Sequence, residues 1–180
     1  MRIFIAIELE DATKKQVLEA ESRIRERLHG IKWVKYENLH ITLRFLGEVS
    51  EEKVKKVERA IEKVSSDTSS FVISGGSFGA FPAPDRARVL FFGIEEGKVD
   101  VYKVFEKLER ELAKMGFERE KKPYHPHITI GRGKRRFFDV SEFLELKAPF
   151  KQKVSGLTLF KSTLTPQGPI YTVIMRGEFK

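Results

Sequence analysis

The stretch Leu39-His40-Ile41-Thr42-Leu43-Arg44-Phe45 has a second form later in the chain, Pro126-His127-Ile128-Thr129-Ile130-Gly131-Arg132. Each copy contains the order His, apolar, Thr, apolar. Successive side chains of a β-strand point to opposite faces, so the His and Thr of each copy share one face and the apolar residues share the other. The pattern predicts two strands that bury their apolar face and present an imidazole and a hydroxyl on the opposite face.

The two copies belong to a longer internal repeat. His127 follows His40 by 87 residues, and the same offset superposes the apolar stretch 3–8 on 90–95. It also matches apolar positions within two segments of helical periodicity, pairing Val17, Leu18 and Leu28 with Val104, Phe105 and Met115. One offset that aligns a strand, a helix and a second strand indicates an internal duplication.

The length of 180 residues fits a single domain over 1–180. We expect this domain to contain two copies of one half, at approximately 1–80 and 88–165. The intervening segment 74–88 contains three Gly and two Pro. These residues interrupt regular structure, so the sequence predicts a connecting loop there.

Helices are predicted wherever apolar residues recur at helical spacing between capping residues. One helix is expected to be capped by Asp11 and to end before Gly30, and a second is expected to be capped by Ser50. A third is expected to end at Gly116, and a short one is expected between Asp139 and Glu142.

The composition excludes several classes of chemistry. The chain has no Cys, which excludes disulfides, thiolate catalysis and Cys-based zinc sites. The apolar run at 3–7 ends at Glu8 and is too short for a signal peptide or a membrane span, so we expect a cytoplasmic protein that is not bound to a membrane. One Asn, three Gln and 33% charged residues favour a heat-adapted protein, and the net charge of +8 favours a polyanionic partner such as RNA.

The paired motifs are suited to in-line displacement at phosphorus in RNA. Such a reaction needs a base for the incoming oxygen and an acid for the departing one, and His40 and His127 can fill both roles because imidazole titrates near neutral pH. The hydroxyls of Thr42 and Thr129 can bind the non-bridging oxygens. Neither motif contains a carboxylate, and we predict no metal and no cofactor. An alternative is a metal held by His125 and His127, which requires a further ligand.

Two arginines are candidates for binding the phosphate. Arg44 shares a strand face with His40 and Thr42, so it could meet an anion. Strict alternation would turn Arg132 into the core, where an unpaired guanidinium is not tolerated. Arg132 can therefore reach the site only if the strand ends or twists near Gly131.

Aromatic and basic side chains near the motifs could bind the rest of an RNA substrate. Phe45, Phe81, Tyr124 and His125 are the predicted substrate-binding residues, with core packing as the alternative for each aromatic ring. Phe137 is a further candidate for stacking on a base. It follows the basic run Lys134-Arg135-Arg136, and Lys121 and Lys122 add to the same charge.

Three stretches of the chain resemble one family. They are Leu39 to Gly47, the pair Phe81-Pro82 with Arg88-Val89-Leu90, and Pro126-His127-Ile128-Thr129. Together they resemble the two-histidine phosphoesterases and, within them, the 2'-5' RNA ligase branch, also called RNA 2',3'-cyclic phosphodiesterases. The resemblance covers nearly the whole chain.

The resemblance implies an α+β fold with two pseudo-symmetric lobes, whose antiparallel sheets face each other across a central cleft and carry helices outside. It implies metal-independent hydrolysis of RNA 2',3'-cyclic phosphate ends to 2'-phosphates, with reversible 2'-5' ligation of ends such as those of tRNA halves, in a monomer. His40 and His127 would be the acid–base pair, and Thr42, Thr129 and Arg132 would hold the phosphate. The alternative is a module that binds RNA ends without turnover.

Overall fold

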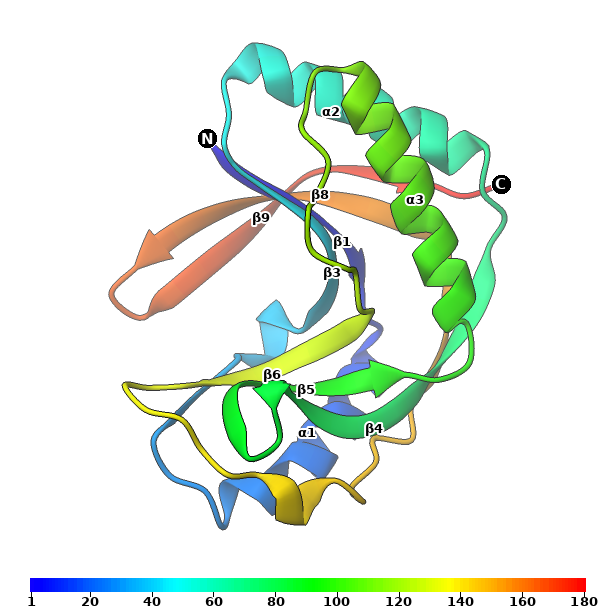
Figure 1. Cartoon of the computed structure of the whole chain (residues 1–180). Coiled ribbons are helices and arrows are strands. Elements are labelled where there is room, and N and C mark those ends of the chain that lie inside the picture. Colours follow the sequence, from blue (N-terminus) through cyan, green and yellow to red (C-terminus); the bar gives the residue numbers. More distant parts are fainter.

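A computed structural model describes all residues, 1–180, as an α+β fold of one curled antiparallel sheet and three helices (Figure 1). The elements, including two short 3-10 helices, are β1 (Arg2–Glu8), α1 (Asp11–Arg25), β2 (Ile31–Trp33), η1 (Tyr36–Asn38), β3 (His40–Glu48), α2 (Glu51–Ser66), β4 (Phe71–Ala83), β5 (Arg86–Ile94), α3 (Lys98–Lys114), β6 (His127–Gly133), η2 (Ser141–Phe143), β7 (Lys151–Val154), β8 (Gly156–Thr165) and β9 (Gly168–Glu178). The α+β class and the antiparallel strands are confirmed.

The strands form one continuous sheet rather than the two sheets predicted. Their order is β7-β4-β5-β6-β3-β1-β8-β9, and β2 pairs with β6 outside this path. The two motif strands β3 and β6 are neighbours at its centre, and their register contains one residue pair, Ile41 with Ile128. The sheet is therefore divided into a β9-β8-β1-β3 lobe and a β6-β5-β4-β7 lobe that meet at the motifs.

Each lobe contains strands from both copies of the repeat. β8 pairs with β1 in the first lobe, whereas β4 pairs with β5 in the second. The offset of 87 residues seen in the sequence also relates the first residues of α1 and α3, Asp11 and Lys98, and those of β3 and β6, His40 and His127. These positions agree with a duplication in which the last strand of each copy pairs with the other copy.

The predicted connecting loop at 74–88 is wrong, because this segment is most of the β4–β5 hairpin. Its glycines are sites of close packing. A Cβ atom on Gly76 would lie 1.5 Å from the carbonyl oxygen of Gly93, and one on Gly75 would lie 1.8 Å from the ring of Phe150. Glycine can indicate a turn or, within a strand, a position where another part of the chain approaches the backbone closely. The glycines of this segment are of the second kind.

The helices follow their predicted apolar stripes and lie on the outside of the sheet (Figure 1). The side chain of Ser50 accepts a hydrogen bond from the backbone N–H of Lys53, which confirms it as the cap of α2. Asp11 is the first residue of α1 rather than its cap, which is Glu10. None of the helices combines the length and the apolar character needed to cross a membrane.

Candidate active site

The two motif strands place their apolar residues as the sequence predicts. Ile41 and Ile128 are fully buried, and the next apolar residues, Leu43 and Ile130, are buried as well. The intervening His and Thr residues point to the opposite face because side chains alternate along a strand. Antiparallel strands joined at Ile41 and Ile128 therefore present both His-x-Thr pairs on one face.

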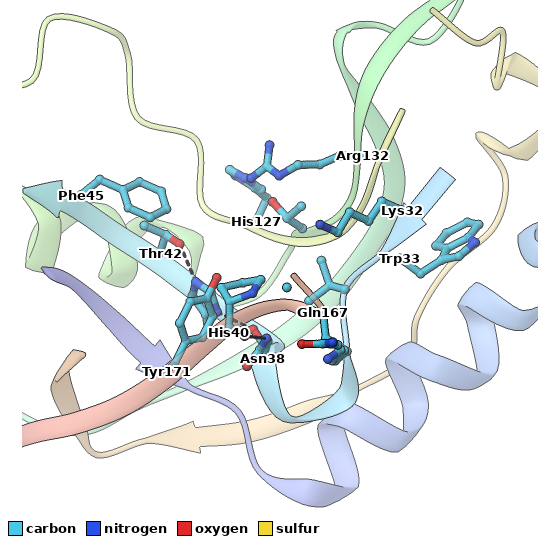
Figure 2. Close-up of a pocket in the computed structure, with 15 residues that line it drawn as sticks. Lys32, Trp33, Asn38, His40, Thr42, Phe45, His127, Arg132, Gln167 and Tyr171 are labelled. Atoms are coloured by element: carbon cyan, nitrogen blue, oxygen red, sulfur yellow. Dashed lines mark hydrogen bonds between the residues drawn. The ribbon is translucent and has the colours of Figure 1, made fainter. Parts of the chain in front are cut away.

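All four motif side chains line one cavity of about 220 Å³ between the lobes (Figure 2). His40 and Thr42 come from β3, and His127 and Thr129 come from β6. The cavity brings together the two half-sites that the sequence predicts. Further lining residues come from the β2–η1 segment and the β8–β9 turn, namely Lys32, Trp33, Val34, Lys35, Asn38, Gln167, Gly168, Pro169 and Tyr171.

The two imidazoles are oriented in the same way. Nδ1 of His40 lies 2.6 Å from the carbonyl oxygen of Asn38, and Nδ1 of His127 lies 2.5 Å from that of His125. A carbonyl only accepts hydrogen bonds, so each Nδ1 must carry a proton and donate it. Each neutral ring therefore has its acceptor lone pair on Nε2. In His40 this nitrogen accepts from the hydroxyl of Thr42 at 2.7 Å.

Aromatic rings pack around each histidine. The ring of Phe4 on β1 lies 5.1 Å from that of His40, and the ring of Phe91 on β5 lies 5.2 Å from that of His127. Phe4 and Phe91 are themselves related by the offset of 87. Tyr171 meets His40 edge-on at 5.5 Å. These rings pack against the imidazoles and leave both half-buried at the edge of the cavity.

Burial makes both imidazoles weak bases. Burial lowers the pKa of His40 from 6.5 to about 4, outweighing the hydrogen bond to Asn38, and the charges of His127 and Arg132 lower it further. Burial also lowers the pKa of His127, again with a contribution from Arg132. Loss of hydration disfavours a charged ring, so both rings are neutral in the free protein at neutral pH.

Arg132 reaches the cavity because β6 contains an extra residue. Phe91 pairs with Thr129 and Leu90 pairs with Gly131, which leaves Ile130 without a partner on β5. Such a bulge reverses the alternation of side chains beyond it. Arg132 therefore emerges on the same side as Thr129, exposed and lining the cavity beside Lys32 (Figure 2).

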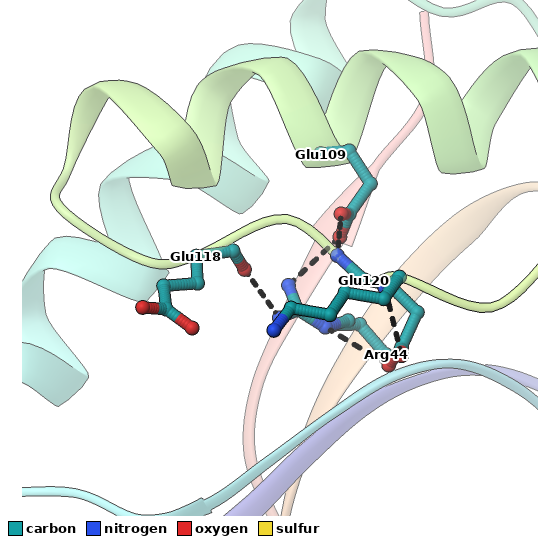
Figure 3. Close-up of polar contacts among 5 residues, drawn as sticks. Arg44, Glu109, Glu118 and Glu120 are labelled. Atoms are coloured by element: carbon teal, nitrogen blue, oxygen red, sulfur yellow. Dashed lines mark hydrogen bonds and ion pairs between the residues drawn. The ribbon is translucent and has the colours of Figure 1, made fainter.

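The prediction that Arg44 binds phosphate is not supported by its contacts. Its Nη1 lies 2.8 Å from the Glu109 carboxylate, and its Nη2 donates to the carbonyl oxygen of Glu118 at 2.6 Å (Figure 3). The Glu120 carboxylate lies 3.8 Å from Nε of Arg44. A guanidinium held between carboxylates has little capacity left for an anionic substrate. Arg44 instead attaches β3 to α3 and to the segment that leads into β6.

Tyr124 has a structural role and also lines a second hollow beside the motif side chains, together with Phe81 and His125. Its ring stacks on Phe105 with the centroids 4.2 Å apart, and its hydroxyl donates to the carbonyl oxygen of Thr42 at 2.8 Å. Burial raises the pKa of this hydroxyl. Tyr124 thus connects the segment before the second motif to the strand of the first.

The other three predicted substrate-binding residues border the site in different ways. Phe81 stacks on Phe91 at 4.4 Å and meets His127 edge-on at 5.1 Å, so it supports that imidazole. His125 is exposed beside Phe81 and supplies the carbonyl that orients His127. Phe45 lines the cavity with 56% of its surface exposed, which leaves its ring available to a ligand.

The sequence reasoning missed the part of the cavity made by Asn38, Gln167 and Tyr171. Asn38 lies 87 residues before His125, so the repeat itself could have identified the carbonyl that orients His40. Tyr171 and Gln167 lie at the β8–β9 turn, which no local pattern connects to the motifs. No group of three or more His, Asp or Glu side chains is positioned to hold a metal ion.

A curled antiparallel sheet with two His-x-Thr strands facing one cavity is the arrangement of the two-histidine phosphoesterases. The family model described as LigT like Phosphoesterase matches residues 7–91 and 93–171. The chain belongs to this family.

Curated relatives and solved structures extend over the whole chain. RNA 2',3'-cyclic phosphodiesterase of Thermotoga maritima is 36% identical over 183 residues, covering 100% of this chain and 96% of the relative. The protein of the same name from Archaeoglobus fulgidus is 37% identical, covering 95% of this chain and 96% of the relative. TT0787 of Thermus thermophilus matches with a TM-score of 0.86 and 29% identity, covering 99% of this chain and 98% of that one. E. coli LigT complexed with 3'-AMP matches with a TM-score of 0.78 and 26% identity, covering 99% and 97%.

Proposed function

We propose that this protein hydrolyses the 2',3'-cyclic phosphate at the end of an RNA to a 2'-phosphate, without a metal ion. The observation that carries the proposal is the matched pair of imidazoles, each fixed by a backbone carbonyl so that the unprotonated nitrogen at the shared cavity is Nε2. Curated relatives that match nearly the full chain bear the name RNA 2',3'-cyclic phosphodiesterase.

In the proposed reaction, a water oxygen attacks phosphorus while the bond from phosphorus to the ribose 3' oxygen breaks. One imidazole takes the proton of the water, and the other, protonated, gives its proton to the departing 3' oxygen. The products are a 2'-phosphate and a free 3'-hydroxyl. The two histidines come from opposite lobes, as groups on either side of one phosphorus must.

The substrate itself must supply the charge that one histidine needs. Both imidazoles are neutral in the free protein because burial lowers their pKa. An anionic phosphate between them raises the pKa of each by favouring the charged form. One ring can then take up a proton while the other stays neutral as the base, which gives a bell-shaped dependence of the rate on pH.

The hydroxyls and Arg132 are suited to bind the non-bridging oxygens. In the free protein the Thr42 hydroxyl donates to Nε2 of His40, so substrate binding releases both groups for the reaction. Thr129 has the equivalent position on β6, and Arg132 adds a positive charge at the cavity. Fixed donors of this kind stabilise the charge that develops at phosphorus.

The same groups would serve RNA ligation. If the 5'-hydroxyl of another RNA replaces the water, its oxygen attacks the cyclic phosphate and its proton passes to the same base. The 3' oxygen leaves as before, and the product is a 2'-5' phosphodiester. The reverse reaction regenerates the cyclic end through the same two proton transfers.

The test is turnover of a 2',3'-cyclic nucleotide by EDTA-treated protein, with the product identified as the 2'- or 3'-phosphate. We expect 2'-phosphate, and a loss of about 10²- to 10⁴-fold in kcat for each of His40→Ala and His127→Ala. His29→Ala, which alters an exposed histidine, is the matched control. Activity that requires added metal, full activity of either motif variant, or RNA binding without product would overturn the proposal.

A further inference from the structure

An exposed cluster of two arginines and a phenylalanine lies next to the cavity. The guanidinium of Arg86 lies 4.8 Å from the ring centroid of Phe137, and that of Arg88 lies 5.1 Å from it. Phe137 keeps 45% of its surface exposed. Neither arginine forms an ion pair, although carboxylates pair with Arg25, Arg27, Arg44 and Arg176 elsewhere in the chain. We call Arg86, Arg88 and Phe137 the Arg–Phe cluster.

A bulge in β5 turns this cluster toward the cavity side of the sheet. Phe81 pairs with Val89 and Pro82 pairs with Ala87, which leaves Arg88 as an extra residue. The bulge reverses the alternation beyond Val89. Ala87 accordingly enters the core, where it is 1% exposed, whereas Arg88 stays exposed on the side of Val89.

The segment after β6 adds Phe137 to the same face. Phe138 pairs with Ala87 across an isolated antiparallel bridge, and both side chains are buried. Neighbouring residues on paired strands point to the opposite face. Phe137 therefore lies with Arg86 and Arg88 on the exposed face, which agrees with the short distances from its ring to both guanidinium groups.

The cluster continues directly from the charged wall of the cavity. Arg132, which lines the cavity, pairs with Val89 on one side and with Lys32 on the other. Because Arg88 is the next residue after Val89, its Cα lies about 6 Å from that of Arg132. Lys32 and Arg132 are exposed and also form no ion pair with a carboxylate. Lys32, Arg132 and Arg88 thus form a positively charged path from the phosphate site to the ring of Phe137.

We propose that the Arg–Phe cluster binds the RNA strand that precedes the cyclic end, at the second or third nucleotide. This inference rests on the proposed function. Guanidinium planes and aromatic rings stack on bases of any sequence, and the N–H groups of Arg86 and Arg88 contact the phosphates. The separation of about 6 Å between the Cα atoms of Arg132 and Arg88 corresponds to about two nucleotides at about 3.4 Å each. The enzyme would therefore favour oligonucleotide ends over cyclic mononucleotides.

The experiment compares kcat/KM for a tetranucleotide ending in a 2',3'-cyclic phosphate with that for the corresponding cyclic mononucleotide. We expect the ratio of kcat/KM for the tetranucleotide to that for the mononucleotide to be roughly ten or more in the unmodified protein. In Phe137→Ala this ratio should fall by roughly tenfold. Arg88→Gln should lower the ratio and should also reduce the slope of log affinity against log salt by about 0.7. Arg59→Gln, which alters an exposed and unpaired arginine on α2, is the matched control.

The outcomes separate this proposal from the proposed function. If the unmodified protein turns over neither substrate, the proposed function fails. If it turns over both with a ratio near one, or if Phe137→Ala and Arg88→Gln keep the ratio of the unmodified protein, the hydrolase stands and the Arg–Phe cluster does not bind RNA. If Arg88→Gln lowers the ratio only as much as Arg59→Gln does, the effect is a general one of charge, and this outcome would also overturn the proposal.

Discussion

The lowered pKa of His40 predicts how the stability of the protein depends on pH. Packing against Phe4 and Tyr171 makes the folded protein hold this ring neutral, with a pKa of about 4. An unfolded chain protonates the same ring near pH 6.5. Between these values the unfolded state binds more protons than the folded one, so the free energy of unfolding falls as the pH falls.

The size of the effect follows from the difference between the two pKa values. Each unit of pKa corresponds to about 1.4 kcal/mol, so His40 contributes about 3 kcal/mol over the full window. Between pH 7 and pH 4.5, which is a practical range for measurement, the loss is about 2.4 kcal/mol. The stability contribution is present above pH 6.5 and is lost as the pH falls toward 4.

The assay is urea unfolding at pH 7.0, 5.5 and 4.5 for the unmodified protein, His40→Gln and His29→Gln. Glutamine carries no titrating group, so the free energy of unfolding of His40→Gln should fall by about 2 kcal/mol less than that of the unmodified protein between pH 7.0 and 4.5. His29→Gln alters an exposed ring and provides the comparison. Identical pH dependence in the unmodified protein and in His40→Gln would refute the assignment of a buried, neutral His40.

Three further variants test contacts around the site. Arg44→Met leaves the buried carboxylate of Glu109 without its cationic partner and should lower the free energy of unfolding by about 3–5 kcal/mol. The double variant Arg44→Met with Glu109→Met should recover most of this loss. An equal loss of stability in the single and the double variant would contradict a buried ion pair. Tyr124→Phe removes the hydrogen bond to Thr42 and should cost about 1 kcal/mol in the same urea assay. Burial raises the pKa of Glu21 from 4.5 to about 7, so the free energy of unfolding falls as the pH rises between these two values and stays at its lower level above pH 7. Glu21→Gln should therefore raise the free energy of unfolding by about 3 kcal/mol at pH 8 and by less than about 1 kcal/mol at pH 5, and a change of equal size at both would count against this.

The residues at the centre of the site could be predicted because their pattern is local. A two-residue period fixes which face a strand residue occupies, and this was enough to place His40 with Thr42 and His127 with Thr129. The internal repeat then indicated that two such pairs belong together. The helices followed for the same reason, because their apolar stripes depend only on spacing.

The roles of the arginines could not be predicted because bulges decide them. Alternation alone places Arg44 in the site and Arg132 in the core, whereas Arg132 lines the cavity and the guanidinium of Arg44 is paired with Glu109. The extra residue Ile130 turns Arg132 to the cavity, whereas Glu109, which is distant in sequence, engages Arg44. Bulges and long-range ion pairs depend on the partner strand or helix, and no period within one strand contains that information.

The exchange of strands between the two copies of the repeat supports the site from behind. β1, which supplies Phe4 behind His40, is held by β8, and β5, which supplies Phe91 behind His127, is held by β4. β8 follows the second motif in the chain and β4 precedes it, so neither lobe can complete its sheet from one half of the sequence. Phe4 and Phe91 therefore reach the two imidazoles from strands that are each paired with a strand of the other copy. The two halves of the cavity meet at the single pair Ile41 with Ile128, and a pairing between the copies lies on each side of it.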